Sequence, residues 1–193
     1  MTAMASTDIQ HLDREQLEAS IADVRASPAE GALEMIVQRP AVDERVVLAE
    51  ARLTCEEGLE GDTWSQRGSK RTEDGSPHPD MQLNIMNSRI LAAIAQSPER
   101  MPLAGDQLIV DMDLSEANLP PWTKLAIGEA VIEVTDQPHT GCAKFSQRFG
   151  VEAHRFVNSD IGKELRLRGI NARVVTPGVI RQGDPIRKLS ADR

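Results

Sequence analysis

The chain has 193 residues, 40% hydrophobic and 27% charged, a balance typical of one folded globular domain or at most two. Thirty acidic against 22 basic side chains give a net charge of −8, which argues against a surface built to bind duplex DNA or RNA. Aromatic residues make up only 3%, too few for stacking single-stranded nucleic acid. The chain has neither an apolar run of about 20 residues nor a recognisable secretion signal, so we expect a cytoplasmic protein with no membrane partner.

The N-terminal segment 8–26 is predicted to form one helix. Thr7 and Gln10 stand in capping-box spacing, and Ser27-Pro28 would end the helix. We therefore divide the chain into an N-terminal helical extension, residues 1–31, and a folded domain, residues 32–193.

From residue 33 onward the hydrophobic period changes from that of a helix to two. Alternating segments occur at 33–37, 46–53, 108–112, 130–135 and 170–175, separated by Gly, Pro and Asp turns. A helix is expected after Asn87, ending at Ser97-Pro98, and two more are expected between Ala143 and Arg168. Helices inserted so irregularly do not suit a doubly wound sheet. The pattern favours a mainly β fold, an antiparallel or mixed barrel with short peripheral helices.

The segment 63–80, TWSQRGSKRTEDGSPHPD, contains almost no apolar residues. Loops longer than about 12 to 15 residues are usually functional or disordered. Its cations, Arg67, Lys70 and Arg71, form a local basic cluster that could hold a phosphate or another anion. A solvated loop whose acidic residues balance these cations explains the same composition. If the loop is functional, we expect it at the rim of the pocket that contains the reactive cysteine described next.

The second feature is the segment 136–150, DQPHTGCAKFSQRFG, which follows the predicted strand at 130–135. It places Cys142 where a loop turns into a helix. The helix N-terminus and the nearby Lys144 and Arg148 would favour the thiolate. His139 lies three residues earlier and could deprotonate the thiol or hydrogen-bond a ligand. The alternative is an inert buried cysteine.

The other cysteine and the remaining histidines give weaker evidence for a catalytic or metal-binding site. Cys55 is flanked by Glu56 and Glu57, whose charges oppose thiolate formation, and is predicted to be structural. The four histidines do not stand in zinc-site spacing, and the chain has no CxxC pair, Walker loop, dinucleotide fingerprint or nucleophile elbow.

Four segments, taken in order, resemble the MOSC family, the molybdenum cofactor sulfurase C-terminal domain. The resemblance covers roughly residues 32–189, and its glycine and turn positions agree as well as its cysteine. The segments are GLEGDTW (58–64), AGDQL (104–108), LSEANLPPWTKLAIGEAVIEVTDQPHTGCAKF (114–145) and LRGINARVVTPGVIRQGDPI (167–186).

The resemblance implies a closed or partly closed MOSC-type β-barrel with one cysteine in a cleft. In such domains that cysteine carries sulfur or ligates molybdenum, and the matching position here is Cys142. The implied cofactor is a molybdenum–pterin. The implied partners are a separate pyridoxal-phosphate-dependent sulfurase or, if the protein reduces N-hydroxylated compounds, an external reductase.

Polar residues of the matched segments and of the basic loop are the candidate contacts to such a cofactor. Cations would bind its phosphate, and amide and acid groups would recognise the pterin edge. The candidates are Arg67, Lys70, Arg71, Asp106, Gln107, Thr140, Lys144, Asn171 and Arg173, with Cys142 and His139 as the reactive pair.

The chain departs from the family pattern at two places. Gly105-Asp106-Gln107 replaces Gly-Glu-Asn, and Thr63-Trp64 replaces a basic pair. The second change leaves open a competing function, a non-catalytic module that binds another small anion or a protein.

Overall fold

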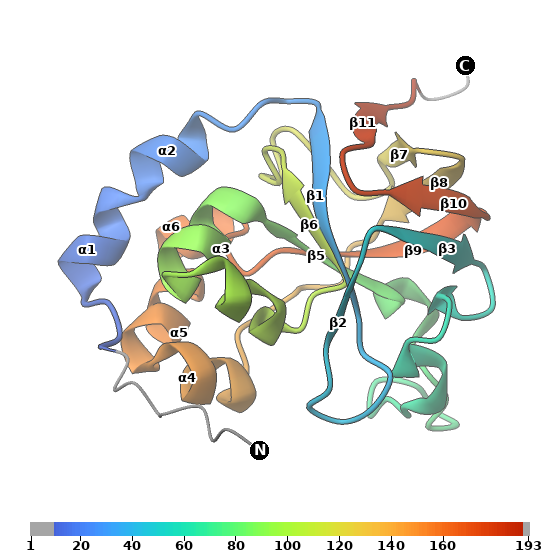
Figure 1. Cartoon of the computed structure of the whole chain (residues 1–193), viewed down its shortest axis with the longest axis horizontal. Helices are drawn as coiled ribbons and strands as arrows, with labels where there is room; N and C mark the ends of the chain where they lie inside the picture. The colour runs from blue at the N-terminus through green and yellow to red at the C-terminus, as the bar shows by residue number, and fades with distance from the viewer. Residues whose placement is uncertain (1–9, 191–193) are drawn as a thin grey trace.

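A computed structural model describes residues 10–190. Its core is a closed barrel of seven strands in the order β11-β7-β8-β9-β5-β6-β1, closed by pairing of β11 with β1 (Figure 1). β2 extends β1 outside the barrel, and β10-β3-β4 form a second, small sheet. The strands are β1 (Gly31–Gln38), β2 (Val46–Leu48), β3 (Glu50–Thr54), β4 (Gly58–Leu59), β5 (Leu83–Asn87), β6 (Leu108–Asp111), β7 (Lys124–Ile127), β8 (Ala130–Val134), β9 (Ile170–Thr176), β10 (Gly178–Arg181) and β11 (Pro185–Lys188).

Short helices gather on one flank of the barrel, seen at the left of Figure 1. The α-helices are α1 (Arg14–Ala19), α2 (Ile21–Arg25), α3 (Ser88–Ala95), α4 (Ala143–Phe149), α5 (Val151–Val157) and α6 (Asp160–Glu164). The 3-10 turns are η1 (Thr63–Gln66), η2 (Pro79–Met81) and η3 (Pro98–Ala104). The predicted mainly β barrel with peripheral helices is confirmed.

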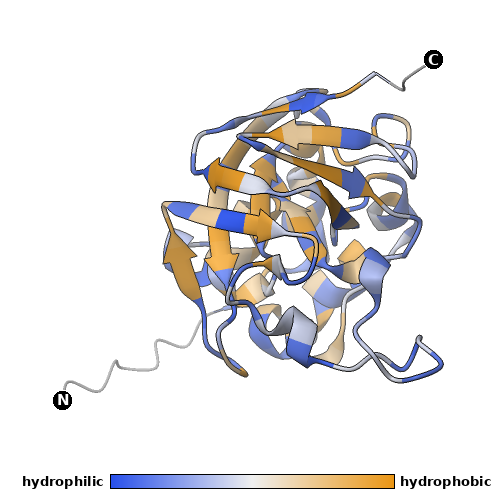
Figure 2. Cartoon of the chain, turned by 90° about the vertical axis from the view of Figure 1, so that its right-hand side faces the viewer, coloured by the Kyte–Doolittle hydropathy of each residue, from blue (hydrophilic) through white to orange (hydrophobic). Residues whose placement is uncertain are grey.

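Two hydrophobic cores meet at the strands β5 and β6. Leu83 and Ile85 of β5 lie in the core inside the barrel. Because side chains alternate between the two faces of a strand, Met86 points the other way and lies in a second core under the helices. β5 and β6 pair in parallel, and the other ladders in residues 10–190 are antiparallel. Strands buried on both faces suit a parallel pair. Figure 2 shows that hydrophobic residues are concentrated in the strands, whereas the loops at the bottom of that view are largely hydrophilic.

Three local expectations are corrected. The predicted N-terminal helix is two short helices, and the capping box is formed by Asp13 and Gln16; Thr7 lies outside the described residues. The alternating segment 46–53 divides between β2 and β3, which belong to different sheets. Three helices, not two, follow Cys142, because Gly150, with a left-handed φ of 93°, separates α4 from α5.

The segment 63–80 is an ordered loop. It begins and ends in the 3-10 turns η1 and η2. Between them the Ser69 N–H donates to the carbonyls of Gly75 and Ser76, and the Thr72 hydroxyl donates to the Ser76 carbonyl at 2.6 Å. The loop thus folds on itself.

Candidate functional site

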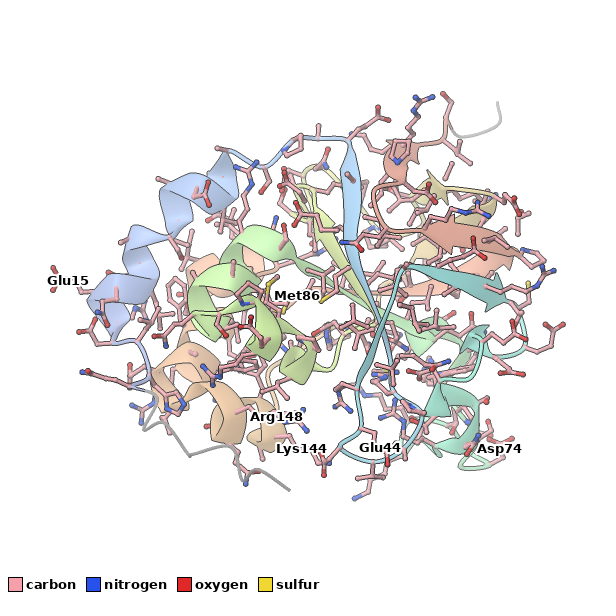
Figure 3. The ribbon with its side chains drawn as sticks, in the orientation of Figure 1. Glu15, Glu44, Asp74, Met86, Lys144 and Arg148 are labelled. Carbon is pink, nitrogen blue, oxygen red and sulfur yellow. The ribbon has the colours of Figure 1, made fainter. Side chains whose placement is uncertain are left out.

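A cleft of about 370 Å³ opens at the end of the barrel, between the β1–β2 loop, the N-terminal part of α4 and the start of the 63–80 loop. Figure 3 shows Lys144 and Arg148 of α4 beside the loop that carries Glu44, with Asp74 of the 63–80 loop on the other side. Six cationic side chains line the cleft: Arg39, Arg45, Arg67, Lys144, Arg148 and Arg168. In a protein of net charge −8, this concentration of positive charge marks the cleft as a place for an anion.

Arg39 and Arg168, the two deepest cations of the cleft, are buried and paired with carboxylates. The Arg39 guanidinium donates to both oxygens of Asp62 at 2.8 Å. Arg168 Nη1 lies 2.9 and 2.8 Å from the two oxygens of Asp106. Both aspartates are almost fully buried. These pairs neutralise the floor of the cleft and hold its shape.

Arg45 and Arg67, by contrast, lack such a partner. Within residues 10–190, Arg45 has no carboxylate oxygen within 4.0 Å, and its buried Nε has no hydrogen-bond partner. Arg67 reaches Asp62 only at 3.9 Å, and that carboxylate is already shared with Arg39. The pKa of Arg45 is lowered, mainly by loss of solvent around the guanidinium and next by the charge of Arg148. The pKa of Arg67 is lowered for the same main reason and next by the charge of Arg39. The positive charges therefore repel one another, and an anion between them would relieve that repulsion.

Asp43 provides the only carboxylate among the described residues that line this cleft. Its Oδ1 lies 3.1 Å from Lys144 Nζ and 2.6 Å from Arg148 Nη2, so it bridges the β1–β2 loop to α4. The Lys144 hydrogen bond lowers the pKa of Asp43. Asp43 also adopts a left-handed φ of 63°, which is uncommon for a residue other than glycine. This exposed carboxylate stands where the acidic group of a ligand would be attracted.

His139 is fixed by Asp106, its Nε2 lying 2.7 Å from Oδ1. Burial and then the charge of Arg168 lower the pKa of His139. For Asp106, burial raises the pKa, but Arg168 and His139 outweigh it and leave the pKa below its ordinary value. The pair is therefore a carboxylate accepting from a neutral imidazole, and Nδ1 of His139 retains its lone pair.

Cys142 lines the same cleft and is exposed. It is the residue before α4 and has extended backbone torsions, and its side chain makes no capping hydrogen bond. α4 is anchored behind it by Phe145, whose ring lies 4.9 Å from the Arg168 guanidinium carbon. An accessible thiol thus stands among cations, in reach of a ligand.

Of the predicted contact residues, Arg67, Lys144, Thr140, His139 and Cys142 line the cleft. Lys70 and Arg71 do not. The beginning of the 63–80 loop therefore borders the cleft, while Lys70 and Arg71 stay outside its lining, although Arg71 Nη1 lies 3.9 Å from the sulfur of Met81, which is in that lining.

The remaining candidates are engaged in the structure. Asp106 pairs with Arg168, and the fully buried Gln107 donates to the Gln82 carbonyl at 3.0 Å. Asn171 is fully buried and accepts from Asn84 at 2.7 Å. Arg173 pairs with Glu133 and Asp80 outside the cleft. None of these four side chains lines the cleft, and each is already paired or hydrogen-bonded within the protein.

Sequence reasoning missed four of the cleft cations, Arg39, Arg45, Arg148 and Arg168, as cofactor contacts. They come from three segments: Arg39 and Arg45 lie between β1 and β2, Arg148 is in α4, and Arg168 precedes β9. The one available signal was the pair of glycine-aspartate turns, because Asp62 and Asp106 each hold one of these arginines.

Residues 10–190 contain neither a cluster of metal-ligating side chains nor a helix that could span a membrane. No three His, Cys, Asp or Glu side chains gather there in a way that could hold a metal ion. No helix in that range is long and apolar enough to span a bilayer.

The comparisons with known proteins agree on one class. The sequence profile of the MOSC domain matches residues 72–187, more than half of the chain. The protein belongs to the MOSC domain family, which in general relates to binding of the molybdenum cofactor. No curated protein sequence matches the chain.

Solved structures resemble the fold. The YuaD protein from Bacillus subtilis is 15% identical with a TM-score of 0.61, over 81% of this chain and 94% of that one. YiiM from Escherichia coli is 24% identical with a TM-score of 0.55, over 86% of this chain and 72% of that one. A structure titled as a hypothetical protein is also 24% identical, with a TM-score of 0.58, over 87% and 71% of the two chains. At these identities the likeness is one of fold.

Proposed function

We propose that this protein binds the molybdenum–pterin cofactor in the cationic cleft and uses Cys142 as its molybdenum ligand or as a carrier of its terminal sulfur. One observation carries the proposal: an exposed thiol lines a cleft with six cations in an acidic protein. A soft thiolate can ligate molybdenum or hold sulfane sulfur, and cations bind phosphate. Membership of the MOSC family supports the same cofactor.

The residues present fit this group. The buried Nε of Arg45 lacks a hydrogen-bond partner, and Arg67 lacks a carboxylate of its own, so both have donors to offer a phosphate. Lys144 and Arg148 become available if Asp43 is displaced. When bound, the cofactor would supply a redox-active metal and a transferable sulfur.

The protein's own groups have defined tasks in this scheme. Arg45 and Arg67 bind the phosphate, and the pairs Arg39–Asp62 and Arg168–Asp106 keep the cleft open at its floor. His139 is neutral and fixed by Asp106, so its Nδ1 accepts a hydrogen bond or a proton from the ligand or from the Cys142 thiol. Sulfur delivery needs a separate pyridoxal-phosphate-dependent sulfurase, and a reductive activity needs an external reductase.

The competing proposal is a non-catalytic module that holds another small anion or a protein. Asp43 favours it, because this carboxylate already satisfies Lys144 and Arg148 and a smaller anion would suffice for Arg45 and Arg67. The two proposals predict different contents for the purified protein.

Metal and pterin analysis separates them. Protein from a host that makes the molybdenum cofactor should contain about one molybdenum and one pterin per chain. Cys142→Ser should lose the molybdenum if Cys142 is the ligand, or should fail to gain the mass of one sulfur atom from a cysteine desulfurase and free cysteine if Cys142 is the carrier. Cys55→Ser, the matched change at the other exposed thiol, should behave as the wild type in both measurements. A folded wild-type protein that contains neither molybdenum nor pterin would overturn the proposal and support the anion-binding module.

A further inference from the structure

A second hollow of about 240 Å³ continues the cationic cleft away from Cys142. It shares four lining residues with the cleft, among them Arg67 and Met81, and adds Trp64 and His78. The two hollows therefore form one groove. Its ends differ in chemistry, since one carries a thiol among cations and the other an indole ring.

Trp64 is held in a defined place at that end. Its backbone N–H donates to Asp62 Oδ1 at 2.9 Å, and Asp62 is the carboxylate that pairs with Arg39. The Arg67 N–H donates in turn to the Trp64 carbonyl at 3.1 Å. One buried aspartate thus fixes the aromatic residue relative to the cations, so the two parts of the groove are positioned together.

The groups around Trp64 can recognise a ring. Trp64 and Met81 are half-buried and offer an aromatic surface and a polarisable thioether. His78 Nδ1 accepts from the Asp80 N–H at 3.2 Å, so in the neutral imidazole the proton sits on Nε2. Nε2 has no hydrogen-bond partner within the described part of the chain and can donate to a ring nitrogen or carbonyl.

From this geometry we infer that Trp64, Met81 and His78 form a subsite for a planar heteroaromatic ring whose phosphate-bearing arm lies on the cleft cations. The inference rests on the proposed function only in that the cations bind the arm. Two ligand sources share this chemistry, a pterin and a purine nucleotide, because both join a flat, nitrogen-rich ring to a phosphate. Aromatic stacking of such a ring would strengthen binding by about 10-fold or more.

The second tryptophan of the chain, Trp122, provides a control for experiments on Trp64. The chain has 2 tryptophans, and Trp122 is half exposed in a separate groove. Arg173 lies over that ring at 5.7 Å but is already paired with Glu133. Trp122→Phe therefore leaves Trp64 as the sole tryptophan without altering the cationic cleft.

The experiment compares three probes by calorimetry on the cofactor-free protein: neopterin monophosphate, GMP and ribose 5-phosphate, which lacks a ring. At least one ring compound should bind about 10-fold more tightly than ribose 5-phosphate and should change the Trp64 emission of Trp122→Phe. The tighter of the two identifies the source as pterin or purine.

The variants Trp64→Ala and Trp64→Phe show whether the advantage comes from the aromatic side chain. Trp64→Ala should remove the advantage and leave ribose 5-phosphate binding unchanged, and Trp64→Phe should restore most of it. Equal affinities of all three probes, or equal loss for all three in Trp64→Ala, would overturn the inference. The same titration on Cys142→Ser separates the two claims, because a retained ring advantage in a protein that never acquires molybdenum supports the subsite alone.

Discussion

Two surfaces of this molecule place an arginine near a tryptophan, yet their charge balance is opposite. Arg173, whose guanidinium carbon lies 5.7 Å from the centre of the Trp122 ring, is held between Glu133 and Asp80, at 2.7 and 3.0 Å. In the cleft that leads to Trp64, Arg67 has only a distant share of a carboxylate that Arg39 already occupies. The first arrangement is complete without a ligand, whereas the second leaves positive charge unbalanced. The presence of an arginine near a tryptophan therefore does not identify a binding site. What identifies one is whether the arginine already has a carboxylate partner within the protein.

The same contrast holds within the cleft, between paired and unpaired arginines. Arg39 and Arg168 form the floor and are neutralised by buried aspartates. Arg45 and Arg67 are left for a ligand. The first pair should matter for stability and the second for binding.

The largest expected effect is on stability. Asp62→Asn should lower the free energy of unfolding by about 3 to 5 kcal/mol, because it leaves Arg39 buried without a counter-charge. Urea unfolding measures this. Asp43→Asn, the matched change at an exposed carboxylate of the same cleft, should have a much smaller effect. Equal losses in the two variants would show that burial does not distinguish these ion pairs.

The second effect is on anion affinity. Arg45→Gln and Arg67→Gln should each weaken pyrophosphate binding by about 10-fold or more, because each removes charge-assisted hydrogen bonds. Calorimetry at low ionic strength measures the change. Arg173→Gln serves as the control, because Arg173 is paired with two carboxylates and lies outside the cleft, and it should leave the affinity unchanged. A loss of affinity in the control as large as in the cleft variants would contradict the comparison.

The third effect depends on pH. Because burial and Arg168 lower the pKa of His139 below the ordinary value of about 6.5, the unfolded chain takes up its proton first as pH falls. The protein should therefore lose stability as the pH drops below about 6.5. Asp106, whose pKa is also lowered, adds a further loss only below its ordinary range near 4.

Urea unfolding at pH 7.5 and 5.5 measures this dependence. His139→Gln should show a smaller loss of stability between these two values than the wild type. If the two proteins lose the same amount, His139 is not held neutral in the folded state.

The smallest effect concerns the carboxylate in the cleft. Asp43→Asn should strengthen pyrophosphate binding by a few-fold, because it removes a competing negative charge from Lys144 and Arg148. The gain should disappear at high salt. Weaker binding in this variant would mean that Asp43 organises the site and does not compete for it.

The sequence predicted the barrel well and the site only in part. Period-two alternation placed strands such as 130–134, and Asn87 as an N-cap gave α3, because these signals are local. The division of 46–53 was missed because both halves alternate, and only tertiary pairing assigns β2 and β3 to different sheets. Cys142 and Lys144 were placed together because they share one segment.

The other cleft cations required the fold. Arg39 and Arg45 lie about 100 residues before Cys142 and come close to it only in the fold. The pairing of Arg39 with Asp62 and of Arg168 with Asp106 is set by packing, which no spacing rule predicts. For the same reason Asp106 and Gln107, both polar beside a turn, were interpreted as ligand contacts although both are fully buried.

The central claim is that an accessible thiol lies in a field of unbalanced positive charge. The most direct measurement compares alkylation of Cys142 and Cys55 by iodoacetate, which is anionic, and by iodoacetamide, which is neutral. At low ionic strength the ratio of the iodoacetate rate to the iodoacetamide rate should be about 10-fold higher at Cys142 than at Cys55, and 1 M salt should narrow the gap. Equal ratios at the two cysteines, or a Cys142 that neither reagent labels in the folded protein, would contradict the claim.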